Sequence, residues 1–224
     1  MLNRDKHRQV MYNILKDIFW LPFSKHLAFK WWTACYFLYG LDRFSTDLDF
    51  DIISDITSWE NFDWEITKIL EKYWILKRGQ KMLLSYWEED MNIKIDISRS
   101  IWKSNKYEIV NFFWTDLNIQ TKDTIFANKL VALMDRKNLA NRDIYDVYFF
   151  FKNGFEINED VIFERTEKKV KEYFWDMIIF LNKLPKNYKI LEWLGEVLNE
   201  KQKTFVKNKL LQELIGILEM RSKF

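Results

Sequence analysis

Short segments in the first half of the chain alternate between polar and apolar residues. An alternation with a period of two is typical of a β-strand that buries one face. Residues 47–52 and residues 92–98 have this pattern. Residues 82–86 and residues 112–122, the latter with a turn, are predicted as further strand segments.

Apolar residues recur every three or four positions elsewhere, which is typical of amphipathic helices. Such helices are predicted at residues 4–19, 33–39, 59–73, 125–136 and 141–148, and beyond residue 158 the pattern stays helical, with a break at Pro185 and Asn187. The fold class predicted is therefore α/β. A small mixed β-sheet with flanking helices is expected over residues 1–122, and a helical domain over residues 123–224.

The strand predicted at residues 47–52 has three carboxylates on one face, from Asp47, Asp49 and Asp51, and apolar residues on the other. Neighbouring carboxylates repel each other unless a cation lies between them. Mg²⁺ prefers hard oxygen ligands from carboxylates, and phosphate oxygens often complete its coordination shell. Taken alone, this pattern indicates an edge strand with an acidic, solvent-facing side more often than a metal site, and both readings are kept here.

The residues before this strand share a longer motif with a known family. An apolar segment at residues 27–29 leads into a turn and the short helix at residues 33–39, and the Asp-x-Asp strand follows. The matching positions are Lys30, Thr33, Ala34, Arg43, Ser45, Asp47 and Asp49. The string resembles the signature of the AbiEii-like toxins, a branch of the polymerase-β-like nucleotidyltransferases. In that signature two glycines follow the lysine, whereas this chain has Trp31 and Trp32.

A second signature of the same toxins resembles a segment of the helical half. It consists of a lysine, an apolar helix, an arginine and then an arginine-aspartate-x-x-aspartate motif, and the matching residues are Lys129, Arg136, Arg142, Asp143 and Asp146. Helical spacing puts Lys129 and Arg136 on one side, and we expect Lys129 on the helix surface. Ordinary helix electrostatics, with Arg142 paired to Asp146, is the alternative reading of this segment.

The resemblance implies a nucleotidyltransferase that moves a nucleotide from a nucleoside triphosphate to an acceptor, with one or two Mg²⁺ ions. Asp47 and Asp49 are expected to bind metal, with Asp96, on the alternating segment 92–98, as the third carboxylate. The expected nucleotide-binding residues are Lys30, Trp31, Trp32, Thr33, Arg43, Ser45 and Arg136. Lys129 is expected to offset developing charge and Asp146 to orient or activate the acceptor, in a cleft between the two domains. Read alone, Asp96 would be an ordinary surface residue.

The resemblance also implies partners. The acceptor is expected to be RNA, such as a tRNA 3′ end, and the protein is expected to be the toxin of a toxin–antitoxin or phage-defence pair whose antitoxin is a DNA-binding regulator. Two alternatives to RNA modification are left open by the sequence. In the first, the same fold modifies a hydroxyl group of a protein or small molecule. In the second, the chain is a catalytically dead binding module, which genuine tryptophans at 31 and 32 would favour.

Tryptophan is unusually abundant and glycine unusually scarce, with 11 Trp and 5 Gly in 224 residues. Glycine alone normally makes up about 7% of a protein. Trp74, Trp87 and Trp114, like the pair in the turn, occupy positions where glycine is natural. The chain is also rich in amino acids with AT-rich codons. One hypothesis is that many of these tryptophans are UGA codons decoded as glycine, and the other is a genuinely tryptophan-rich protein.

Composition and charge bear on nucleic-acid binding, disulfides, zinc sites and membrane segments. The net charge of +2 and a pI near 8.4 give no general case for nucleic-acid binding, so any RNA affinity requires local patches. A single cysteine excludes an intramolecular disulfide framework, and two distant histidines make a structural zinc site unexpected. The charged N-terminal segment is unlike a signal peptide, and no apolar run of about 20 residues occurs. A cytoplasmic protein without membrane contact is expected.

Overall fold

The structure is a computed structural model that describes residues 3–54, 59–73, 75–77, 82–85, 92–136 and 138–223. The chain divides into two compact units. The first, here called the sheet unit, comprises Met1–Lys103 and Tyr107–Gln120, and the second, the helical unit, comprises Ser104–Lys106 and Thr121–Phe224. The fold is of the α/β class, as the sequence predicted.

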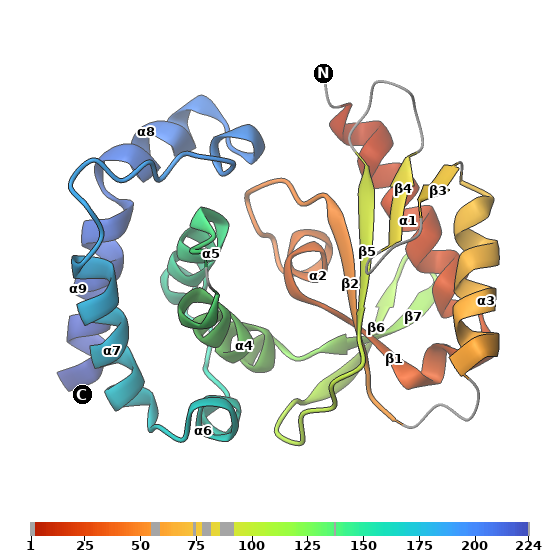
Figure 1. The fold of residues 1–224 in the computed structure, drawn as a ribbon, viewed down its shortest axis with the longest axis horizontal. Coiled ribbons are helices and arrows are strands. Elements are labelled where there is room, and N and C mark those ends of the chain that lie inside the picture. Colours follow the sequence, from red (N-terminus) through yellow and green to blue (C-terminus); the bar gives the residue numbers. More distant parts are fainter. Residues whose placement is uncertain are drawn as a thin grey trace. The chain divides into compact units, whose positions relative to one another are not determined.

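A seven-stranded mixed sheet forms the centre of the sheet unit, in the order β3-β4-β5-β2-β1-β7-β6 (Figure 1). The strands are β1 (Leu27–Lys30), β2 (Asp47–Ile52), β3 (Ile75–Lys77), β4 (Met82–Ser85), β5 (Ile93–Ser98), β6 (Tyr107–Phe112) and β7 (Thr115–Gln120). Strand β1 pairs antiparallel with β2 and parallel with β7, and β2 pairs parallel with β5.

Strand β2 lies inside the sheet, between β1 and β5, so both of its edges are hydrogen-bonded. Its bounds match the predicted strand 47–52, but five of its six residues are buried, including Asp49 and Asp51. The alternative of an edge strand with an acidic, solvent-facing side is therefore wrong. Buried carboxylates require partners or a cation, because isolated charges are costly to remove from water.

The helices of the sheet unit are α1 (Arg4–Phe19), α2 (Trp31–Leu38) and α3 (Trp59–Glu71), with the 3₁₀ helix η1 (Pro22–His26) before β1. Helix α1 begins after Asn3, whose side chain accepts a hydrogen bond from the Lys6 amide at 3.0 Å. Helices α1 and α3 contact each other on the same side of the sheet (Figure 1), and α2 packs against β1 and β2. Both predicted long helices are confirmed within two residues at each end.

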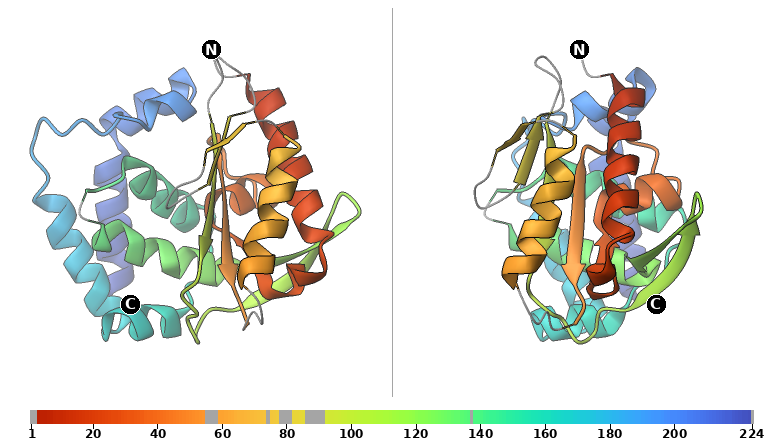
Figure 2. Two further views of the ribbon diagram at one scale, coloured as in Figure 1. Left: turned by 45° about the vertical axis from the view of Figure 1, so that its right-hand side comes forward. Right: turned by 90° about the vertical axis from the view of Figure 1, so that its right-hand side faces the viewer.

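The helical unit contains α4 (Lys122–Asp135), α5 (Asn141–Lys152), α6 (Glu159–Thr166), α7 (Val170–Asn182), η2 (Gly195–Val197), α8 (Glu200–Asn208) and α9 (Leu210–Lys223). Helices α7 and α9 run side by side (Figure 2), and α4 packs against α5 and α6. A cluster of aromatic rings from α4 and α5, with Phe126 and Phe150 at a centroid distance of 5.0 Å, fills the core between these helices. The predicted break at Pro185 is confirmed, since it lies between α7 and α8.

Residues Ser104–Lys106 belong to the helical unit although they lie between β5 and β6 in the sequence. The Asn158 side chain donates to the Ser104 carbonyl at 2.9 Å, and the Asn128 side chain donates to Asn105 Oδ1 at 2.9 Å. The Thr121 amide donates to the Lys106 carbonyl at 3.0 Å. The chain therefore passes between the two units three times.

Two strands were not predicted at their observed places. Strand β6 begins at Tyr107, and most of its side chains are exposed or half-buried, so it lacks an apolar face that would show in the sequence. Strand β3 is only three residues long. Within the described ranges, no helix is both long and apolar enough to cross a membrane.

Candidate active site

A row of three charged residues crosses the middle of the sheet. Lys30 on β1 is the register partner of Asp49 on β2, and Asp49 is in turn the register partner of Asp96 on β5. Register partners on adjacent strands extend their side chains from the same face of a sheet. Asp47, two residues before Asp49, lies on that face as well. The fold therefore brings Asp47, Asp49 and Asp96 to one face, as the sequence suggested.

The carboxylate of Asp51, the third on β2, accepts hydrogen bonds from three side chains. Lys30 Nζ and Gln120 Nε2 each lie 2.5 Å from one of its oxygens, and the Tyr107 hydroxyl donates at 3.2 Å. Asp51 and Lys30 form an ion pair with almost no solvent exposure. Asp51 is thus the counter-charge of Lys30, and it is a partner that sequence reasoning missed, because Gln120 and Tyr107 lie far along the chain.

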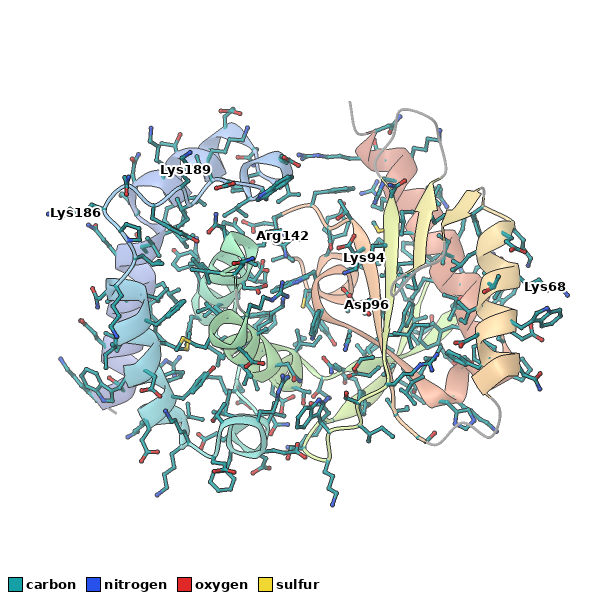
Figure 3. All side chains as sticks on the ribbon, in the orientation of Figure 1. Lys68, Lys94, Asp96, Arg142, Lys186 and Lys189 are labelled. Atoms are coloured by element: carbon teal, nitrogen blue, oxygen red, sulfur yellow. The ribbon has the colours of Figure 1, made fainter. Side chains whose placement is uncertain are left out.

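The carboxylates of Asp47 and Asp49 fit a divalent cation. They project from one strand face two residues apart, and ionised carboxylates offer only acceptor oxygens, which Mg²⁺ prefers. Asp96 is half-exposed and pairs with Lys94 on its own strand at 3.5 Å (Figure 3). Across the described part of the chain, no three His, Cys, Asp or Glu side chains converge closely enough to hold a metal. The arrangement therefore offers two ligands, with Asp96 turned to a lysine.

The turn between β1 and α2 contains the strained backbone of the site. Trp31, the first residue of α2, has φ +60°, in the left-handed region that glycine adopts at little cost. The preceding residue, Lys30, gives the helix no side-chain cap. Amide groups at an uncapped helix N-terminus attract anions such as phosphate.

Thr33 and Ser45, both expected to hold phosphate, are buried and bonded to each other in this structure. Their hydroxyl oxygens are 2.8 Å apart, and the Thr33 hydroxyl also donates to the Asp47 carbonyl. These bonds tie the first turn of α2 to the start of β2. From α1, buried His7 bonds the neighbouring Thr46 carbonyl through Nε2 at 3.1 Å, so Nε2 carries the proton.

Both tryptophans of the turn contact cations that the resemblance assigns to the nucleotide. Lys30 Nζ lies 4.6 Å from the centre of the Trp31 ring, and the guanidinium carbon of Arg43 lies 4.7 Å from the Trp32 ring. Such cation–π contacts strengthen when the cation is removed from water, and Arg43 is buried. Each indole therefore covers part of a cation that the resemblance assigns to nucleotide binding.

A second group of charged residues lies inside the helical unit. Lys129 Nζ on α4 lies 2.8 Å from one oxygen of Asp143 on α5, and Arg136 Nε lies 3.0 Å from the other oxygen. Asp146, one turn further along α5, is fully buried as well. The structure thus brings Lys129 and Arg136 together around Asp143, which sequence reasoning had not given a role.

The expectation that Lys129 lies on the helix surface is wrong. Its side chain is fully buried, because α4 has apolar residues on almost every face and is covered by α5 and α6. Burial lowers the pKa of Lys129 to about 8, although Asp143 and Asp146 act in the opposite direction. The Lys129 ammonium is therefore easier to deprotonate than that of an exposed lysine.

Ordinary helix electrostatics would pair Arg142 with Asp146, one turn further along α5. No ion pair joins it to Asp146 or to any other residue in the described ranges, and its side chain is half-buried (Figure 3). The pairing of Arg142 with Asp146 is therefore not formed in this structure.

Comparison with known proteins agrees with this architecture. The family model "Nucleotidyl transferase AbiEii toxin, Type IV TA system" matches residues 13–216. The crystal structure of JHP933 from Helicobacter pylori is similar to the chain with a TM-score of 0.56 and 21% identity, covering 100% of this chain and 97% of that one. A putative nucleotidyltransferase from H. pylori is similar with a TM-score of 0.53 and 23% identity, covering 97% and 96%.

These two likenesses show the fold, whereas the family match covers most of the chain and includes both groups of charged residues. A search of curated proteins finds no match. The chain belongs to the AbiEii family of nucleotidyltransferase toxins, the enzymes of type IV toxin–antitoxin systems.

Proposed function

We propose that this enzyme transfers a nucleotide from a nucleoside triphosphate to a hydroxyl group of RNA, such as a tRNA 3′ end, in a Mg²⁺-dependent reaction. The observation that carries the proposal is the row of Lys30, Asp49 and Asp96 across the sheet, with Asp47 on the same face. Family membership supports the reaction type. The metal and the acceptor are proposed from the chemistry of the residues and from the resemblance.

Asp47 and Asp49 would hold Mg²⁺, with Asp96 joining them once Lys94 no longer occupies it. When bound there, Mg²⁺ would neutralise phosphate charge and lower the pKa of an attacking hydroxyl. Lys30 and the uncapped amides at the start of α2 would bind the triphosphate, since both present positive charge. Asp51 keeps the Lys30 ammonium in place through their buried ion pair.

The helical unit contains charged groups whose proposed roles come from the resemblance. Lys129 and Arg136 would stabilise the negative charge of the triphosphate, and Asp146 would orient the acceptor hydroxyl. In this structure Lys129 and Arg136 share the single carboxylate of Asp143. A triphosphate that competes with Asp143 would keep Lys129 charged, because a nearby anion raises the pKa of an ammonium.

The test uses two forms of the protein, the chain as written and the Trp31→Gly/Trp32→Gly double variant. Each is incubated with labelled nucleoside triphosphates, Mg²⁺ and total tRNA, and the label is measured in the RNA, protein and small-molecule fractions. We expect label in RNA from the double variant, and none from the chain as written, because its indoles cover Lys30 and Arg43.

The control is Asp49→Asn in the double variant, which should lose the labelling. Label that appears only in the protein or small-molecule fraction would replace RNA with that acceptor class. Equal labelling by both forms would contradict the role given to the turn. If neither form bound a nucleoside triphosphate, the chain would act as a binding module without catalysis.

A further inference from the structure

Where the structure describes the chain, left-handed backbone positions are filled by tryptophan more often than by glycine. Among the described residues, positive φ angles occur at Gly40 and Gly154, at three tryptophans, and at Phe113 and Glu167. The three tryptophans are Trp31 with φ +60°, Trp114 with φ +66° and Trp193 with φ +60°. Only a few per cent of residues other than glycine adopt positive φ, and a bulky residue there is an outlier. Here three of the nine described tryptophans do so.

Trp114 occupies the glycine position of a tight hairpin turn. Strands β6 and β7 pair up to Phe112 and Thr115, which leaves two residues in the turn, Phe113 with φ +44° and Trp114 with φ +66°. Positive φ at both central positions defines a type I′ turn, which strongly favours Asn-Gly. The Trp114 side chain is 93% exposed, so burial of its ring does not offset the backbone strain.

Trp193 lies in an equally tight turn in the helical unit. The Leu194 amide donates to the Glu192 carbonyl at 2.7 Å, which closes a three-residue turn with Trp193 at its centre. A turn of this kind with positive φ is rare and strained for residues with a side chain. The Trp193 ring is 73% exposed, and thus again gains little from packing.

We propose that Trp31, Trp114 and Trp193 are glycines in the functional protein, because their codons are UGA and the source organism decodes UGA as glycine. The three positions lie in three unrelated turns of both units and share only the backbone conformation. The chain has 11 tryptophans and only 5 glycines, which agrees with such a reassignment at these positions. This inference does not depend on the proposed reaction, since two of the three turns are outside the candidate site.

The direct test is to read the codons and to sequence peptides of the protein isolated from its source cells by mass spectrometry. UGA codons and glycine-containing peptides at 31, 114 and 193 are expected. A UGG codon, or tryptophan in the native peptide, overturns the assignment at that position.

A second test uses recombinant protein and needs no native material. Trp114→Gly and Trp193→Gly should each shift the folding equilibrium toward the native state by about fivefold or more, because the left-handed strain of a side-chain-bearing residue is removed. The matched controls are Trp64→Gly in α3 and Trp175→Gly in α7, exposed tryptophans inside helices. Glycine weakens a helix interior, so both controls should shift the equilibrium the other way. Destabilisation by Trp114→Gly or Trp193→Gly overturns the proposal.

Discussion

Replacing Lys129 with methionine removes the cation that faces Asp143 inside the helical unit. The two side chains have 0% and 2% exposure, and their charged atoms are 2.8 Å apart. Breaking a buried ion pair from one side costs about 3–5 kcal/mol, because the remaining charge is left without compensation. Arg136 still lies 3.0 Å from the second oxygen of Asp143, so we expect a loss near the lower end, about 3 kcal/mol. This is a large part of the roughly 5–15 kcal/mol that stabilises a typical domain.

The measurement is urea denaturation of the wild type, Lys129→Met and the double variant Lys129→Met/Asp143→Leu. Removing both charges should recover most of the lost stability, since apolar residues of similar volume replace buried ion pairs at little cost. The matched control is Lys168→Met, which breaks an exposed pair with Asp176 at 2.6 Å in the same unit. That change should cost less than about 1 kcal/mol.

Nucleotide transfer is then measured after the same substitutions are made in the Trp31→Gly/Trp32→Gly protein, because no transfer is expected from the chain as written. If the Lys129–Asp143 pair takes part in the reaction, the Lys129→Met/Asp143→Leu protein should be stable but inactive. Stability and activity would then be separated. If Lys129→Met/Asp143→Leu left transfer by the Trp31→Gly/Trp32→Gly protein unchanged, the Lys129–Asp143 pair would have no role in the reaction, and Lys129 would be a structural residue.

Three further predictions concern single groups. In the Trp31→Gly/Trp32→Gly protein, Asp49→Asn should lower transfer by roughly 10²-fold or more while the protein stays folded, because it removes a carboxylate proposed to bind metal without changing its shape. Circular dichroism and the labelling assay check this, with the exposed Asp116→Asn on β7 as control. The lowered pKa of Lys129, about 8 against an ordinary 10.5, means that the unfolded chain binds an extra proton between these pH values. The contribution of Lys129 to the free energy of unfolding should therefore rise with pH in that window, and a pH series of urea titrations should show this rise in the wild type but not in Lys129→Met. Asp51→Asn should cost about 3–5 kcal/mol and, in the Trp31→Gly/Trp32→Gly protein, raise KM for the triphosphate, because Lys30 loses its buried counter-charge. An unchanged KM at full stability would contradict the positioning role of Asp51.

The alternation of residues 47–52 was sufficient to predict β2 to the residue, because a strand with one apolar face has a clear period of two. The same signal gave the approximate bounds of β5. Strand β6 lacks it, since Glu108 and Ile109 are both exposed, and its place follows from pairing with β7 alone. The pattern of polar and apolar residues within a segment does not show which other segment it will pair with.

The hydrogen-bond partners of the site residues were harder to predict than the site residues themselves. The motif spacing identified Lys30 and Asp49, but it contained no sign that Gln120 and Tyr107 would bond Asp51. The burial of Lys129 did have a signal, since the apolar residues of α4 surround the helix on almost all faces, which is typical of a buried helix. Trp74 and Trp87, predicted to occupy glycine positions, lie outside the described residues.

The order of strands in the sheet has a consequence for synthesis of the protein. Strand β1 leaves the ribosome early, but its partner β7 is made only with residues Thr115–Gln120, and the two pair in parallel. Until then β1 has an unpaired edge, and such edges invite association with other chains. The register partner of Asp49 on β5 is also absent until Asp96 has been made. A nascent chain that stops before residue 96 therefore lacks the complete row of Lys30, Asp49 and Asp96. A chain that stops before residue 115 has an incomplete sheet that is prone to aggregation.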